Sequence, residues 1–259
     1  MSEIAYRPRS ASEVVDAAFQ LFRQHFKTFV VVTAVAYLPM LIVNNVLAYL
    51  FHFEESIASG ELSAAMLISP LLGMVWFGLV SALLAVAASE AYLQRAPDPA
   101  AVFRAAVSRA APIVACVLVV TAAIGVGMIL LVVPALYLYA KYGMAPIVAV
   151  LEGTGVRESL TRSAALSRGR KWHVLKTMML VLVIFFGMVF ALGLVALAFA
   201  NPLFIAALGF VVTVLTYPMI ALVQTILYYD MRIRAEGYDV QLMSERLGLS
   251  LEPVAAYTA

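Results

Sequence analysis

The sequence has little charge and a single cysteine. Charged residues make up 12% of the 259 residues, about half of the roughly 25% found in soluble domains, whereas hydrophobic residues make up 64%. The lone Cys116 cannot form an intramolecular disulfide. This composition excludes a soluble enzyme, a nucleic-acid-binding protein, a disordered chain and a disulfide-stabilised secreted domain.

The longest uncharged stretch, from Thr177 to Tyr229, covers 53 residues. One helix of that length would measure about 80 Å, whereas the hydrocarbon core of a bilayer is about 30 Å thick, so the stretch must cross a membrane twice. Prolines indicate breaks at Val133–Pro134 and at Asn201–Pro202. We therefore predict an all-α, polytopic membrane protein that forms a single integral-membrane domain (1–259) of three helical hairpins. The six predicted spans are 28–51, 64–91, 111–132, 135–151, 174–199 and 203–228, followed by a cytoplasmic tail at 230–259.

The basic residues indicate how the chain is oriented. Of the 17 Lys and Arg residues, all but Lys141 lie before span one, between spans two and three, between span four and the first turn of span five, or after span six. The other three connections (52–61, 133–134 and 200–202) contain none. The positive-inside rule therefore predicts an inner-membrane protein with both termini in the cytoplasm.

Three segments that precede the odd-numbered spans (10–27, 98–109 and 155–171) mix polar and apolar residues at helical spacing. Ser10 and Glu13 have the spacing of a capping box, and Asp98 with Pro99 is typical of a helix start. We expect amphipathic helices on the cytoplasmic membrane surface, with their apolar sides toward lipid. Each would form a repeated unit with the hairpin that follows it; the alternative is convergence among loops that enter a membrane.

Lys141 is the one basic residue expected well inside a span, since Lys176 lies in the first turn of span five. A lysine at mid-membrane costs about 2.5–3.5 kcal/mol on insertion scales. Asn44 and Asn45 match it in depth, and Tyr137 lies one turn away on the same span. These residues could line a polar cavity that binds an anion or a lipid headgroup, or Lys141 could simply extend its amine to the outer interface. A second depth-matched pair, Glu90 and Gln224, is expected to hydrogen-bond between helices.

A basic segment follows span four. At about 1 kcal/mol for each Lys or Arg near an anionic leaflet, it could bind lipid, or it could act only as a topology signal. The residues of this candidate lipid-contact surface are Arg157, Arg162, Arg168, Arg170, Lys171 and Trp172.

The stretch YYDMRIRAEGYD (228–239) follows the last span. Asp230 with Arg234, and Arg232 with Glu236, have the i,i+4 spacing of ion pairs on a helix, and Gly237 suits a helix end. The two tyrosines, 228 and 229, are expected at the level of the lipid headgroups. The stretch could serve only the local structure, or it could dock a partner or the protein's own cytoplasmic helices.

Together with Pro134, Lys141, Pro146, Glu152 and the segment 158–175, this stretch resembles a family of bacterial membrane proteins. The family is named for the membrane domain of glycerophosphoryl diester phosphodiesterase, and the resemblance covers roughly residues 98–240. It implies a multi-pass membrane protein. In the enzymes of that name a separate catalytic barrel of about 250 residues accompanies this region. Since the present sequence has no room for such a barrel, we do not expect the catalytic activity.

Conventional catalytic motifs are missing from the sequence. The histidines at 25, 52 and 173 have no partner at metal-ligand spacing, and HExxH, GxSxG and phosphate-loop motifs do not occur. We expect no cofactor, no metal and no enzymatic activity. The expected function is that of a structural or accessory subunit that binds another membrane protein or itself, with anionic lipids on the cytoplasmic side and no nucleic acid. The alternative is a lipid-handling or small-solute transport protein, which would need a hydrated cavity reaching Lys141.

Overall fold

The computed structural model describes residues 7–50, 64–95, 97–199 and 202–246, and every regular element in them is a helix. Six apolar segments are long enough to cross a membrane, so the chain is an all-α, polytopic membrane protein. These segments are α2 (Phe26–Leu50), α4 (Ala64–Tyr92), α6 (Ala110–Leu130), α7 (Val132–Tyr142) continued by α8 (Ala145–Glu152), α10 (Lys171–Phe199) and α11 (Pro202–Glu236).

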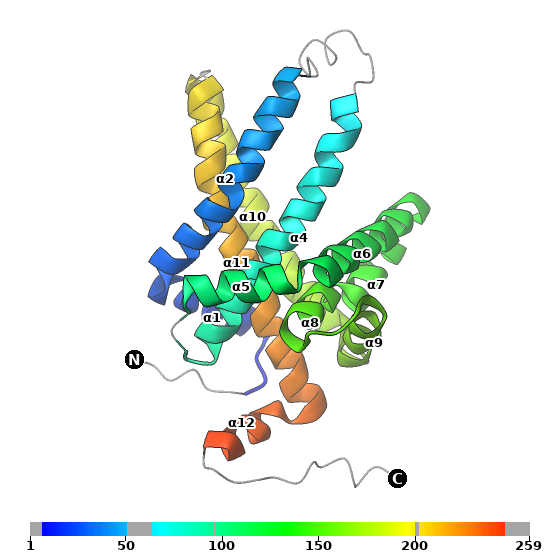
Figure 1. Cartoon of the computed structure of the whole chain (residues 1–259). Helices are drawn as coiled ribbons and strands as arrows, with labels where there is room; N and C mark the ends of the chain where they lie inside the picture. The colour runs from blue at the N-terminus through cyan, green and yellow to red at the C-terminus, as the bar shows by residue number, and fades with distance from the viewer. Residues whose placement is uncertain (1–6, 51–63, 96, 200–201, 247–259) are drawn as a thin grey trace.

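Four shorter helices lie toward one end of this bundle, which is the lower half of Figure 1. They are α1 (Ala11–Gln24), α5 (Pro99–Ser108), α9 (Val156–Leu166) and α12 (Tyr238–Arg246). We call this end of the bundle the polar end. The expected segments at 10–27, 98–109 and 155–171 correspond to α1, α5 and α9, while the predicted loop at 52–61 lies outside the described residues.

The start of α1 has the predicted capping box. The Ser10 hydroxyl accepts a hydrogen bond from the Glu13 backbone N–H, and the Glu13 carboxylate accepts one from the Ser10 backbone N–H at 2.8 Å. The latter hydrogen bond and the ion pair with Arg7 lower the pKa of Glu13 to about 2. The two hydrogen bonds between Ser10 and Glu13 satisfy backbone N–H groups that the N-terminus of a helix otherwise leaves without partners, and they stabilise the first turn of α1.

The apolar stripe of α1 packs against protein. Val14 and Ala18 are fully buried and Leu21 is nearly so, because α10 and α11 cover this side of the helix. The expectation that these residues face lipid is therefore wrong; in the segment 10–27, the exposed large apolar side chains are those of Phe19 on α1 and Phe26 at the start of α2. Burying a Val or Leu side chain stabilises a fold by about 1.5–3 kcal/mol, so α1 is held as part of the bundle.

Helix α11 is the centre of the fold. It packs against α1, α2, α4 and α10, and its Leu222 and Ile226 are buried in the same core as Leu84 and Ala88 of α4. Consecutive long helices also contact one another, in the pairs α2 with α4, α6 with α7, and α10 with α11. Buried alanines on α4, including Ala85 and Ala88, allow α11 to pack closely against it, and small residues of this kind are enriched where membrane helices meet.

The chain between α6 and α9 bends at two places. Helix α6 ends at an extended Leu131, so Pro134 lies in the first turn of α7, where a proline is tolerated. The predicted break at Val133–Pro134 is thus shifted to Leu131. A second break, between Tyr142 and Ala145, divides the predicted span 135–151 into α7 and α8, with Pro146 near the start of α8. The sixth predicted span (203–228) continues as helix to Glu236.

Gly127 allows the tight turn between α6 and α7. A Cβ atom there would lie 2.8 Å from the Ala135 Cα atom, whereas one at Gly125 would meet nothing within 4 Å. We predict that Gly127→Ala lowers the free energy of unfolding by about 1–3 kcal/mol through overpacking. Gly125→Ala is the matched control and should be neutral or stabilising, because alanine favours a helix. Thermal unfolding in detergent measures both, and equal melting temperatures would contradict the prediction.

Candidate functional site: an ion-pair network at the polar end

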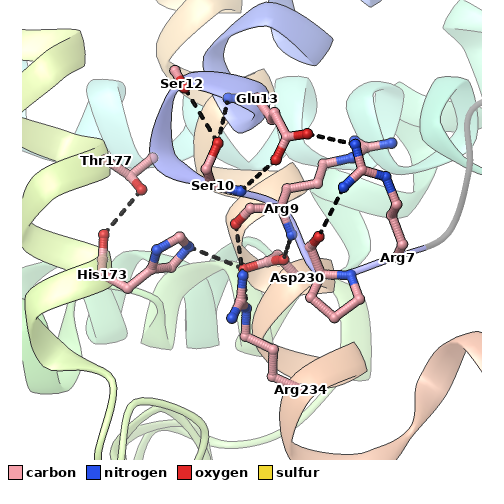
Figure 2. Close-up of polar contacts among 10 residues, drawn as sticks. Arg7, Arg9, Ser10, Ser12, Glu13, His173, Thr177, Asp230 and Arg234 are labelled. Carbon is pink, nitrogen blue, oxygen red and sulfur yellow. Dashed lines mark hydrogen bonds and ion pairs between the residues drawn. The ribbon is translucent and has the colours of Figure 1, made fainter.

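A buried carboxylate, that of Asp230 on α11, organises the polar end (Figure 2). Asp230 is 1% exposed. Its oxygens accept hydrogen bonds from the Arg9 backbone N–H at 2.7 Å and from Arg234 Nε at 2.8 Å, and His173 Nε2 lies 3.0 Å away. The carboxylate therefore connects α11 with the segment before α1 and with the first turn of α10.

Arg234 also connects α11 with the segment before α1. Its guanidinium donates to the Arg9 backbone carbonyl at 2.6 Å, so Arg9 is bound through both its N–H and its C=O. The Arg170 guanidinium in turn donates to the backbone carbonyl of Arg234 at 2.9 Å. The end of α11, the start of α10 and the N-terminal segment are thus held in one arrangement.

A neighbouring group of charges connects α8, α9 and α11. The Glu152 carboxylate accepts from Arg162 Nε at 3.1 Å and from the Tyr228 hydroxyl at 2.7 Å. Arg162 also pairs with Glu236, whose carboxylate accepts from Arg232 Nε at 3.1 Å. Partial burial lowers the pKa of Arg162, but the hydrogen bonds and charges of the two glutamates outweigh it and raise that pKa, so Arg162 stays charged.

Aromatic rings surround this charge network. The Arg232 guanidinium lies 3.8 Å from the ring centre of Tyr238, a cation–π contact. The Tyr229 ring stacks between those of Tyr92 and Tyr238, with centres 4.9 and 5.8 Å apart, and its hydroxyl is 2.6 Å from the Ser89 hydroxyl. Tyr228 and Tyr229 are buried, so their rings contact protein rather than lipid, and their position at the level of the headgroups stays a prediction. Their hydroxyls meet protein partners because α11 is the central helix.

The two predicted ion pairs in 228–239 are confirmed. Asp230 pairs with Arg234 and Arg232 with Glu236, each at i,i+4 on α11. Gly237 has a φ of +63°, as expected for the residue that ends a helix, and α12 begins directly after it. The stretch packs against the protein's own N-terminal segment and its helices α9 and α10, whereas binding of a separate partner stays a prediction.

The structure does not bring Lys141 to the asparagines of span one. The Lys141 ammonium lies over the Tyr142 ring, 4.7 Å from its centre, and the Tyr137 hydroxyl is 3.4 Å from Lys171 Nζ. Figure 1 draws the upper part of α2, which carries Asn44 and Asn45, far from α7. The Asn45 side chain donates to the Leu41 carbonyl of its own helix, and the Asn44 side-chain oxygen has no hydrogen-bond partner among the described residues.

The reason is that α7 packs against α6, α9 and α10, whereas α2 packs against α4 and α11. The Ser163 hydroxyl of α9 donates to the Lys141 backbone carbonyl at 2.9 Å and satisfies an acceptor that the end of α7 leaves open. A small cavity of about 130 Å³ does lie between α4, α6, α7, α8 and α11, and its lining includes Tyr139 and Gln224 but not Lys141. The predicted hydrogen bond between Gln224 and Glu90 is not formed among the described residues; Gln224 and Tyr139 instead line this cavity together.

The predicted lipid-contact surface divides into two groups. Arg162, Arg170 and Lys171 contact other parts of the protein, the last through the ring of Tyr137 at 4.5 Å. The exposed members of the set are Arg157, Arg168 and Trp172, and the Trp172 side chain is 76% exposed.

The sequence pattern does not indicate three residues that make polar contacts between segments at this end of the molecule. Arg9 acts largely through its backbone, for which a sequence pattern carries no signal, and His173 was set aside because no ligand lies near it in sequence. The third, Arg109, donates to the Val150 carbonyl in the last turn of α8 and lies beside Gly153, whose φ is +70°. A cation is favourable at the C-terminal end of a helix. The sequence feature that could have indicated this contact is the glycine that ends α8, because such an end attracts an arginine.

Among the described residues, His, Cys, Asp and Glu do not form a group of three or more that could hold a metal ion. The network therefore consists of ion pairs and hydrogen bonds between protein groups. In such an arrangement the charges position helices, and each of the two carboxylates Asp230 and Glu152 is balanced by at least one guanidinium.

Comparison with known proteins assigns the chain to a family. The model of a family described as "Domain of unknown function (DUF8558)" matches residues 100–253, more than half of the chain, so the protein belongs to this family. No curated protein and no solved structure matches. The matched region contains Glu152, Arg162, His173, Asp230 and Glu236, whereas Arg9 lies outside it.

We predict that Asp230→Asn lowers the free energy of unfolding by about 3 kcal/mol, because it breaks a pair whose carboxylate is buried and leaves the partly buried Arg234 without its charged partner. The N-terminal segment should loosen at the same time. Thermal unfolding in detergent measures the first effect, and hydrogen exchange of the Arg9 amide measures the second. The control is Asp16→Asn, at an exposed position on α1, which should change neither. Wild-type stability and amide protection in Asp230→Asn would contradict the prediction.

Proposed function

We propose that the protein is a non-enzymatic, multi-pass protein of the inner membrane that serves as a structural or accessory subunit and binds another membrane component. One observation carries the proposal: most charged side chains at the ends of α8, α10 and α11 contact one another rather than an open cavity. Charges used in this way build a rigid surface, which is what a docking subunit requires.

The exposed residues next to the network support a binding role. Arg157, Arg168 and Trp172 project from α9, from the turn after it and from the start of α10. Tryptophan and arginine are the residues most enriched at the energetic centres of protein interfaces, and arginine also binds anionic headgroups. The partner we propose is another membrane protein or a second copy of this chain, with anionic lipid at the same surface.

The alternative, lipid handling or transport of a small solute through a cavity around Lys141, has less support. The interior cavity of about 130 Å³ is lined mainly by apolar side chains and does not include Lys141. A transport path for a polar solute needs a hydrated route with polar groups along it.

We further propose that the resemblance to the membrane domain of glycerophosphoryl diester phosphodiesterase has its basis in this network. Of the residues that carry the resemblance, Glu152, Arg162 and Glu236 are joined by ion pairs, and Asp230 pairs with Arg234 in the neighbouring group on α11. A shared network explains a shared motif without a shared catalytic activity.

The proposed orientation places the polar end in the cytoplasm, and cysteine labelling tests it. In a Cys116→Ala background, Ser56→Cys should react with an impermeant maleimide added to intact cells, because 52–61 would face outward. Glu158→Cys, at an exposed position on α9, should react only after the membrane is opened. The reverse pattern would contradict the orientation.

The proposed role predicts a stoichiometric partner that depends on the exposed residues of α9 and α10. The tagged full chain is purified from native membranes in mild detergent, and co-purifying proteins and lipids are quantified by mass spectrometry. We expect one protein to co-purify at a near-equimolar ratio. Its amount should fall at least tenfold in the variant that combines Arg157→Gln, Arg168→Gln and Trp172→Ala. Arg23→Gln, at an exposed position on α1, is the control and should retain it.

Two outcomes would contradict the accessory role. The first is that no protein co-purifies near equimolar ratio, and the second is that the combined variant retains the partner. Uptake of a solute by proteoliposomes containing the purified protein would instead favour the transport alternative.

A further inference from the structure

An open groove runs along the surface between α2 and α5. It has a volume of about 780 Å³, within the range of roughly 300–1,000 Å³ that holds drug-sized ligands. One wall is formed by Val31 and Val35 of α2, with Leu83 of α4 between the walls, and the other by Phe103 and Val107 of α5. In Figure 1, α5 lies across the bundle. The α2 residues that line the groove belong to the apolar span that begins at Phe26, so the groove reaches the membrane-spanning part.

A single charge borders this apolar groove. Arg104 of α5 lines it, and within the described part of the chain Arg104 is exposed and has no hydrogen bond, ion pair or cation–π contact. By contrast, Arg109 and Arg162 both have protein acceptors. The groove thus has apolar walls and, at the polar end, one guanidinium that has no partner within the described part of the chain.

We propose that this groove binds one phospholipid with an anionic headgroup. The phosphate contacts Arg104, whose planar guanidinium can donate two parallel hydrogen bonds to it, and an acyl chain lies along Val31, Val35 and Phe103. The charge selects the occupant: an apolar helix of a partner would cover Arg104 without giving it an anion, whereas an anionic phospholipid supplies both chemistries. The site does not depend on the accessory role proposed above.

The protein carries its own reporter for this site. The Trp76 indole N–H donates to the backbone carbonyl of Ala36 at 2.8 Å, and Ala36 lines the groove. The sequence has two tryptophans, so Trp172→Phe leaves Trp76 as the sole tryptophan. Its fluorescence will fall when a lipid with bromine atoms in the middle of its acyl chains occupies the groove.

The experiment reconstitutes the full-length Trp172→Phe protein into phosphatidylcholine vesicles. One set of vesicles contains a tenth of dibrominated phosphatidylglycerol, and a second set contains the same fraction of dibrominated phosphatidylcholine. One Arg near an anionic lipid contributes about 1 kcal/mol, so the groove should be enriched in phosphatidylglycerol about fivefold over the bulk fraction of this lipid. Stronger quenching of Trp76 by the brominated phosphatidylglycerol reports this enrichment. The excess quenching should fall as salt is raised.

Substitutions of Arg104 decide whether this excess belongs to the groove. Arg104→Gln should abolish it, and Arg104→Lys should retain part of it, because the charge stays while the paired hydrogen bonds are lost. Arg23→Gln is the matched control and should keep the full excess. Circular dichroism and thermal unfolding show that each variant is folded, and Arg104 is exposed, so we expect wild-type values.

Three results would overturn the proposal. Equal quenching by the two brominated lipids would mean an annular lipid only, without a site. An excess that survives Arg104→Gln would place the anionic lipid elsewhere. Lack of quenching by either lipid, in a folded protein, would mean that the groove is closed to lipid, as expected if a second protein chain filled it.

Discussion

The polar end of the molecule depends on the burial of one charge, the Asp230 carboxylate. An isolated ionised group in such a position would cost several kcal/mol, and only partners with good geometry offset that cost. Asp230 obtains them from the Arg9 backbone, from Arg234 on its own helix, and from His173. Because these partners come from three segments, satisfying the charge also sets the positions of the N-terminal segment and of α10 relative to α11.

The need to pair buried charges explains why some charged side chains of the polar end contact protein groups while others are exposed. Arg162, Arg232 and Arg234 lie among carboxylates and rings, and their role is to hold helices together. Arg104 and Trp172 are free of such contacts within the described part of the chain and face outward. The inward charges therefore shape the surface, and the outward side chains are the ones available to a lipid or a partner. For this reason, both proposed binding sites, for a partner and for a lipid, lie on the protein surface.

Lys141 shows why burial and neighbours are hard to infer from sequence in a membrane protein. Its position along a predicted straight span placed it near the outer boundary, at the depth of Asn44 and Asn45. In the structure α7 packs against α6, α9 and α10, and the Lys141 carbonyl meets Ser163 of α9, whereas α2 packs against α4 and α11. Depth matching assumes straight helices perpendicular to the membrane, and it carries no information on which spans are neighbours.

Uncharged stretches, proline positions and i,i+4 spacings determine much of this protein from the sequence alone. They are local properties, and they suffice for six apolar segments, for the capping box of α1 and for the ion pairs of α11. Only the tertiary structure decided that α1 packs against α10 and α11, that Arg9 and His173 meet at Asp230, and that Arg104 borders a groove. These contacts join residues up to 221 positions apart, and their energy depends on which helices pack together, which periodicity does not encode.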